Sequence, residues 1–163
     1  LVCNAATNPY AGPMAGIADD QFEKILQNNV ISNHWLIQMV APQMLERKDG
    51  AILVISSIGG LRGNALIGAY NISKAADMQL VRNLAVEYGP SNVRVNCIAP
   101  AMIETELLQQ MTEQYIAAMK GKIPMGRLGR PEEAAELVGW LASPACSFST
   151  GAVFDLSGGR ATY

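Results

Sequence analysis

Apolar residues follow two patterns along this chain, namely short continuous runs and longer stretches with helical spacing. The short runs, which are typical of buried strands, span residues 1–4, 51–56, 93–98 and 152–156. The longer stretches, in which apolar residues recur mostly every three or four positions, span residues 20–46, 69–88 and 131–142. Strands that alternate with helices through short loops predict an α/β fold built on a parallel sheet.

Polar and helix-breaking residues predict where these helices begin and end. Asp19 or Asp20 is a candidate N-cap for the first helix, since a carboxylate there can accept from free backbone N–H groups. The pair Gly89-Pro90 ends the second helix. Pro131 suits the first turn of the third helix, where its missing N–H costs nothing.

Composition narrows the class of protein. The 163 residues are half hydrophobic, which is enough for one domain with a real core. A net charge of -2 gives no electrostatic case for nucleic-acid binding. No apolar stretch reaches the roughly 18 residues of a membrane span, and residue 1 does not open a basic signal peptide. We therefore expect a cytoplasmic protein that spans no membrane and binds no nucleic acid.

The residues that most often bind metals are few and scattered. Cys3, Cys97 and Cys146 lack the spacing of metal ligands, and the single His34 cannot complete a site with them. Buried, reduced thiols and no metal site are the expectation.

Candidate chemistry gathers after the strand at 51–56. Tyr70 and Lys74 are four residues apart at the start of a predicted helix, which places the phenol and the ammonium on one face. Two unit charges about 4 Å apart interact by roughly 4 kcal/mol at an effective dielectric of about 20, or up to about three pKa units. Lys74 could therefore bring the Tyr70 phenol toward neutral pH, and the Ser57 hydroxyl at the strand exit could donate to a substrate oxygen.

Each of these residues has a plainer explanation when it is taken alone. Tyr70 and Lys74 form a pair that is common on exposed helices. Ser57 alone reads as a turn serine, and Asn29 alone reads as a polar residue on a long helix. The case for chemistry depends on the ordered set.

That set resembles the short-chain dehydrogenase/reductase family. Residues 70–74 match its Y-x-x-x-K motif, and Ser57 stands at the distance of its active-site serine. Four further matches follow the family's order, namely Asn4-Ala5-Ala6, Asn28-Asn29-Val30, residues 96–101, and residues 126–133 with Ser157-Gly158-Gly159. Ala6 and Ala101 stand where the family has glycines, which puts the closest backbone approach at Ala101 in question. One such motif is weak, whereas five in order are specific.

The resemblance implies a Rossmann-like doubly wound parallel sheet and an NAD- or NADP-dependent oxidoreductase that interconverts an alcohol and a ketone or aldehyde. The catalytic residues that it implies are Asn29, Ser57, Tyr70 and Lys74. The cofactor-binding residues that it implies are Asn4, Ala5, Ala6, Tyr70, Lys74, Pro100, Ala101, Ile103 and Thr105.

The family's glycine-rich cofactor fingerprint is not found in residues 1–163. The cluster Gly59, Gly60 and Gly63 has the wrong spacing and follows the serine. We expect one partial domain that runs from the family's fourth strand to its C-terminus and lacks the first three strands, on the order of 80 residues. The strand at 1–4 would then be an open apolar edge.

A second hypothesis follows from the missing fingerprint. The chain could be a truncated, catalytically silent subunit that assembles through the helices at 20–46 and 69–88, which in the family form a four-helix interface. In either case the resemblance implies a homo-oligomer, a dimer or a tetramer.

Residues 102–124 would be the mobile lid over the substrate. A small, apolar alcohol or carbonyl substrate is suggested by Leu61, Leu66, Ile67, Met102, Leu107, Leu108 and Met111.

Overall fold

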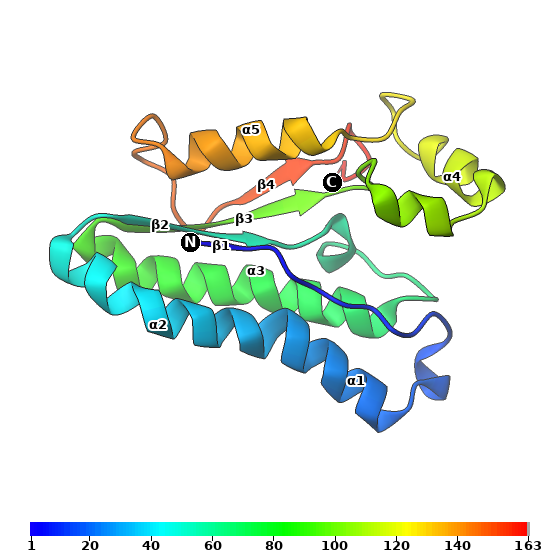
Figure 1. Cartoon of the computed structure of the whole chain (residues 1–163), viewed down its shortest axis with the longest axis horizontal. Coiled ribbons are helices and arrows are strands. Elements are labelled where there is room, and N and C mark those ends of the chain that lie inside the picture. Colours follow the sequence, from blue (N-terminus) through cyan, green and yellow to red (C-terminus); the bar gives the residue numbers. More distant parts are fainter. Residues whose placement is uncertain (163) are drawn as a thin grey trace.

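Four parallel strands form one sheet in the order β1-β2-β3-β4 (Figure 1). The computed structural model describes residues 1–162, apart from the side chain of Leu107. Its strands are β1 (Val2–Cys3), β2 (Gly50–Ile55), β3 (Val93–Pro100) and β4 (Val153–Leu156). Each predicted strand is confirmed, and the parallel pairing agrees with the predicted alternation of strands and helices.

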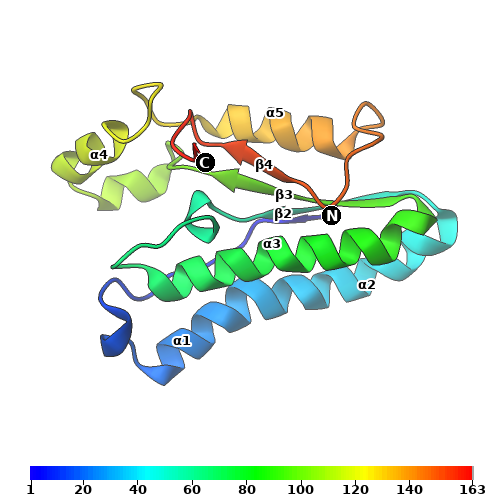
Figure 2. The same cartoon turned by 180° about the vertical axis from the view of Figure 1, so that it is seen from behind.

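Helices cover both faces of this sheet, as Figure 1 and, from behind, Figure 2 show. One face carries α1 (Asp19–Leu26), η2 (Gln27–Ile31), α2 (Ser32–Arg47) and α3 (Gly68–Tyr88). The other face carries α5 (Pro131–Ala142), while η5 (Glu106–Gln110) and α4 (Glu113–Lys120) lie beyond the carboxyl ends of the strands. The doubly wound architecture is therefore confirmed.

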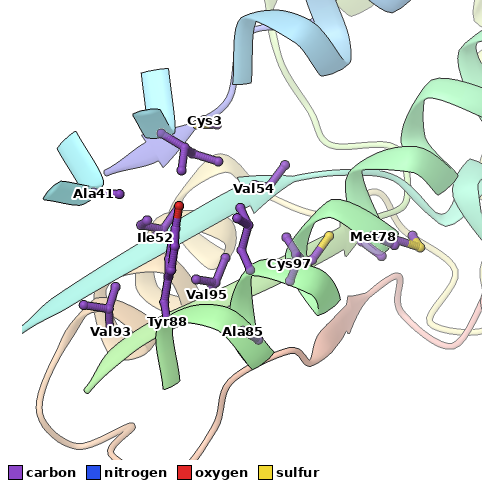
Figure 3. Close-up of a cluster of buried hydrophobic side chains, with 14 of the residues drawn as sticks. Cys3, Ala41, Ile52, Val54, Met78, Ala85, Tyr88, Val93, Val95 and Cys97 are labelled. Atoms are coloured by element: carbon purple, nitrogen blue, oxygen red, sulfur yellow. The ribbon is translucent and has the colours of Figure 1, made fainter. Parts of the chain in front are cut away.

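The core consists of two clusters because strand side chains alternate between the two faces. Ile52 and Val54 of β2 belong to the larger cluster, which packs against α2 and α3. Leu53, between them, belongs to the smaller cluster with Leu141 of α5. Figure 3 shows the larger cluster, where side chains of β2 and β3 meet those of α3.

The three thiols are free and buried, as expected. Cys3 and Cys97 lie in the larger cluster, and Cys146 lies in the smaller one.

The helix boundaries confirm two predictions and correct one. The second helix ends at Tyr88, just before Gly89, and Pro131 is the first residue of α5. The predicted N-cap is wrong, because Ala18 occupies it and neither carboxylate caps the first helix. Asp19 and Asp20 lie instead in the first turn, where negative charge still favours the helix dipole.

The first predicted helix, 20–46, is not uniform. Between α1 and α2 the chain forms one π-helical turn, η2, and Asn29 in that turn is fully buried. Single π-turns inside α-helices often occur at functional sites. The turn therefore marks Asn29 as a residue whose placement the fold specifies.

Candidate active site

The candidate residues meet at the carboxyl ends of the strands, where parallel sheets most often bind ligands. The segments that leave β1, β2 and β3 all emerge at this edge, and α3 begins there (Figure 1). Residues that are far apart in sequence are thereby brought into one region.

Two consecutive serines at the end of β2 have different surroundings. Ser56 is buried and donates from Oγ to the Lys74 carbonyl at 2.7 Å, which fastens the strand end to α3. Ser57 is half-buried, and its Oγ accepts from the Gly59 backbone N–H at 3.0 Å. Because a hydroxyl that accepts one bond still has its own hydrogen, Ser57 can donate to a further oxygen.

Tyr70 and Lys74 share a face of α3, as their spacing predicts. The Lys74 Nζ lies 5.8 Å from the centre of the Tyr70 ring, and the lysine is only 1% exposed. The Nζ donates to the Ile55 carbonyl at 2.8 Å and to the Asp77 carboxylate at 3.1 Å. The ammonium is thus held by the end of β2 and by its own helix.

The expected pKa of Tyr70 is wrong in direction. Burial raises the pKa of the phenol, a hydrogen bond with the Ser57 side chain lowers it, and the charge of Asp77 raises it. The net pKa is above the ordinary value of a tyrosine. The main physical reason is burial, which disfavours the charged phenolate, and the charge of Asp77, the ion-pair partner of Lys74, adds to the rise.

Asn29 joins three segments through its side chain. Its Nδ2 donates to the Ser73 hydroxyl at 2.9 Å and to the Thr7 carbonyl at 3.0 Å. Its Oδ1 accepts from the Thr7 backbone N–H at 2.7 Å. Both amide hydrogens and one lone pair of Oδ1 are therefore in use, which fixes the Asn29 side chain.

The segments expected to bind the cofactor lie on the same edge of the sheet. Asn4, Ala5 and Ala6 follow β1 and are exposed. Pro100 ends β3, and the Ala101 N–H donates to the Leu156 carbonyl at 3.0 Å. Ala101 does not adopt a positive φ, so the alanine is accommodated here without backbone strain.

Ile103 and Thr105 extend this segment toward η5. The backbone beside Ile103 pairs with Gly129, through the Met102 carbonyl at 3.1 Å and the Glu104 N–H at 2.8 Å. In a parallel bridge of this kind the N–H and C=O of Ile103 itself face away from Gly129. Thr105 is the N-cap of η5, and its side chain makes no capping bond.

A cavity of about 140 Å³ lies beside Ala101, between Leu128, Gly129 and the end of β4. Of the predicted site residues, Ala101 lines this cavity and Tyr70 does not. The cavity is therefore not the place where Tyr70 would act.

The residues of the predicted apolar wall differ in exposure, and Ile67, Met102, Leu108 and Met111 are half-buried. Leu66 is largely exposed, and Leu61 packs in part against the core. The side chain of Leu107 lies outside the described part of the chain.

Sequence reasoning missed four polar residues around this site, namely Thr7, Asn33, Ser73 and Asp77. Asn29 bonds to Ser73, and Asn33 donates from Nδ2 to Asp77 Oδ1 at 3.0 Å. Both pairs span 44 positions, which is the mark of two helices packed in parallel register. The sequence did contain a sign of these contacts. In each helix two polar residues lie four positions apart on an otherwise apolar face, at 29 and 33 in the first helix and at 73 and 77 in the second.

Two features of the described chain bear on other kinds of site. Within residues 1–162, no helix combines the length and apolar character that a membrane crossing requires. In the same residues, no three His, Cys, Asp or Glu side chains gather closely enough to hold a metal ion.

Comparison with known proteins covers nearly the whole chain. The family model described as enoyl-(acyl carrier protein) reductase matches residues 1–161. The chain is 38% identical over 164 residues to dehydrogenase/reductase SDR family member 4 of Sus scrofa, covering 99% of this chain and 59% of that protein. It is 36% identical over 163 residues to 2-dehydro-3-deoxy-L-rhamnonate dehydrogenase (NAD(+)) of Sphingomonas sp. (strain SKA58), covering 100% of this chain and 66% of that protein.

A solved structure, ElxO with NADP bound, is similar with a TM-score of 0.93 and 29% identity, over 98% of this chain and 66% of that one. The chain thus spans 59% of the length of the porcine relative and 66% of the bacterial one. The family model and both relatives indicate the same family as the sequence resemblance. The chain therefore belongs to the short-chain dehydrogenase/reductase family.

Proposed function

We propose that the protein is an NAD- or NADP-dependent oxidoreductase that interconverts an alcohol and a ketone or aldehyde. The observation that carries the proposal is the placement of the Lys74 ammonium 5.8 Å from the centre of the Tyr70 ring, on the same face of α3, with a Ser57 side chain that acts to lower the pKa of the phenol. The Tyr70 phenol is an acid, the Ser57 hydroxyl is a neutral donor and the Lys74 ammonium is a fixed cation. Together, near the end of β2, they are suited to proton transfer at a substrate oxygen.

The residues fit a nicotinamide cofactor by the chemistry of their donors. An ammonium has three hydrogens, and Lys74 uses two of them on Ile55 and Asp77, which leaves one for a ribose hydroxyl. The backbone groups of Ile103 that face away from Gly129 suit a carboxamide. Names of similar proteins support this cofactor class, since the Sphingomonas relative is a dehydrogenase (NAD(+)) and the ElxO structure has NADP bound.

The chain's own residues would divide the proton chemistry among them. When bound, the nicotinamide supplies or accepts the hydride. Because burial raises its pKa, Tyr70 is protonated at neutral pH and can donate its proton to a carbonyl oxygen during reduction. Ser57 would donate a second hydrogen bond to that oxygen, and Lys74 would hold the ribose. Asn29 would hold a water that continues the proton relay.

Two further parts of the proposal concern the substrate and the assembly. Leu66, a largely exposed apolar residue in the loop between β2 and α3, supports an apolar substrate. Trp35, Leu36 and Met39 of α2 and Val86 of α3 are exposed large apolar residues, which supports a homo-oligomer through these helices. The alternative of a catalytically silent subunit is not favoured, because the similar proteins have the names of dehydrogenases or reductases.

The decisive experiment replaces Tyr70 with Phe in the full-length protein. We expect kcat/KM on a panel of ketones and aldehydes, measured with NADH and NADPH, to fall by about 100-fold or more. Cofactor binding, followed by the fluorescence of the reduced nicotinamide, should change little, because the ring is retained. The matched control is Tyr10→Phe, which removes a phenol that donates to the Pro13 carbonyl outside the site. Normal turnover by Tyr70→Phe would refute the proposed function.

A further inference from the structure

The partner of the Lys74 ammonium is a carboxylate that the reaction scheme above does not use. Asp77 has no exposed surface and Lys74 is 1% exposed, with Oδ2 and Nζ 3.1 Å apart. The other Lys74 contact, to the Ile55 carbonyl at 2.8 Å, is uncharged. Within the described chain, the Asp77 carboxylate is therefore the direct counter-ion of this lysine.

A second helix holds the other oxygen of the same carboxylate. Asn33 of α2 donates from Nδ2 to Asp77 Oδ1 at 3.0 Å and to the Asn29 carbonyl at 2.7 Å. Each carboxylate oxygen thus has one donor, and the carboxylate cannot rotate without losing one of them. A buried ion pair that also has such hydrogen bonds is fixed in position.

We propose that Asp77, held by Asn33, is a positioning residue of this site, whose carboxylate fixes the Lys74 ammonium and offsets part of its charge at the Tyr70 phenol. The inference rests on the proposed function and deepens it, because it assigns to a buried carboxylate the setting of the pH range in which Tyr70 exchanges its proton. Asp77 does not touch the reacting atoms and acts through Lys74.

The groups that feel this carboxylate come from each element packed around it. They are Tyr70 and Lys74 of α3, Cys3 of β1 and Cys97 of β3, while α2 contributes the uncharged Asn33. The charge of Asp77 raises the pKa of Tyr70 and of both thiols. Burial raises the pKa of Asp77 itself, and the charge and hydrogen bond of Lys74 and the hydrogen bond of Asn33 oppose that rise.

The test is the titration of Tyr70 in an Asp77→Asn variant of the full-length protein. Ultraviolet absorbance of the phenolate is followed against pH, and the same titration with Tyr70→Phe added isolates the Tyr70 signal. Removing a nearby unit charge is worth on the order of one pKa unit at an effective dielectric of about 20, so the midpoint should move down by about one pH unit. An unchanged midpoint, or one at higher pH, would overturn the proposal.

Two variants separate charge from packing. Asp49→Asn makes the same chemical change at an exposed position before β2 and should leave the midpoint in place. Asn33→Ala loosens the network but keeps the charge, so it should move the midpoint less than half as far as Asp77→Asn. An equal shift in Asn33→Ala would assign the effect to packing and overturn the proposal. If Asp77→Asn does not fold, Asp77→Ala, whose side chain is smaller and fits the same space, removes the charge without placing an amide opposite Asn33.

Kinetics distinguish this inference from the proposed function. The absorbance titration needs no turnover, so a wild-type protein that oxidises no alcohol would refute the proposed function and leave the titration to decide on Asp77. With an active protein, the pH at which kcat/KM for alcohol oxidation is half its plateau should fall by the same amount as the absorbance midpoint. If the absorbance midpoint of Tyr70 moves but the pH dependence of kcat/KM does not, the positioning role of Asp77 is overturned.

Discussion

Gly60 shows how a single atom can control the distance between the loop after β2 and α3. A Cβ at this position would lie 2.7 Å from the Lys74 carbonyl carbon and 2.9 Å from the Ala75 nitrogen, and both atoms are backbone. Backbone atoms cannot swing aside as a side chain can. The loop would have to move away from the helix, and Ser57 would move with it.

We therefore expect Gly60→Ala to be destabilising by about 1–3 kcal/mol, as other overpacked sites are. Its kcat/KM should fall by about tenfold or more, because Ser57 and Tyr70 separate. Urea unfolding and steady-state kinetics measure the two effects. Gly63→Ala is the matched control, since a Cβ there meets nothing within 4 Å. Equal behaviour of the two variants would show that the close approach has no consequence.

The pKa of Tyr70 marks a limit of sequence reasoning at the scale of residues. Spacing alone correctly predicts that Tyr70 and Lys74 share a face of one helix. It does not predict the direction of the pKa, because that depends on burial and on Asp77. The role of Asp77 depends in turn on Asn33, which is 44 positions away. A pairwise estimate between two charges omits the third charge.

The π-helical turn η2 (Gln27–Ile31) is an element that the sequence did not predict. Residues 27–31 contain neither glycine nor proline, so no local signal interrupts the helical pattern. The turn is instead associated with tertiary bonds, since Asn29 within it binds both Thr7 and Ser73. A wide turn adds one residue while keeping the two flanking helices in phase.

Deleting Asn28 should return this segment to a regular α-helix. Helical content by circular dichroism should be retained, because α1 and α2 keep their phase. Asn29 should lose contact with Thr7 or Ser73, which leaves buried polar groups unpaired and costs about 1–3 kcal/mol in urea unfolding. We expect kcat/KM to fall by about tenfold or more, whereas Asn28→Ala, which keeps the length, should leave it unchanged. Full activity in the deletion variant would show that the wide turn has no role in the site.

Regular elements were predictable because their signals are local. Apolar runs located β2 and β3 to within two residues at each end, and Pro131 located the first residue of α5. The N-cap of α1 was not predictable, because two adjacent carboxylates fit equally well and neither makes the bond. The bonds between α2 and α3 depend on how two helices pack, which their separate patterns do not specify.

At the scale of the whole molecule, the sheet separates two helical layers that differ in the size of their core cluster and in whether they carry candidate catalytic groups. The face that carries α2 and α3 contains the larger core cluster and, at its edge, the candidate catalytic groups. The face that carries α5 contains the smaller cluster, and Arg94 of β3 secures the end of α5 through the carbonyls of Leu141 and Ser143. The predicted α/β architecture accounts for both layers. Two of the expected buried thiols, Cys3 and Cys97, lie within the larger cluster.

Cys97 has no exposed surface and lies on β3 within that cluster (Figure 3). Burial and, to a smaller extent, the charge of Asp77 together raise the pKa of its thiol from 9.0 to about 12. In the unfolded chain the thiol ionises near its ordinary pKa, while in the folded chain it stays protonated. The contribution of this thiol to the stability of the fold is therefore fully present below pH 9.0 and is lost as the pH rises toward about 12.

This coupling predicts the alkaline stability of a Cys97→Ala variant. One such group costs roughly 1.4 kcal/mol of unfolding free energy per pH unit. Between neutral pH and two units above the ordinary pKa of the thiol, Cys97→Ala should therefore lose about 3 kcal/mol less than the parent in urea unfolding. Val95→Ala opens a cavity on the same face of β3 without removing a thiol, so its curve should lie below the parent and parallel to it. Parallel curves for both variants would mean that the Cys97 thiol ionises alike in the folded and unfolded chains.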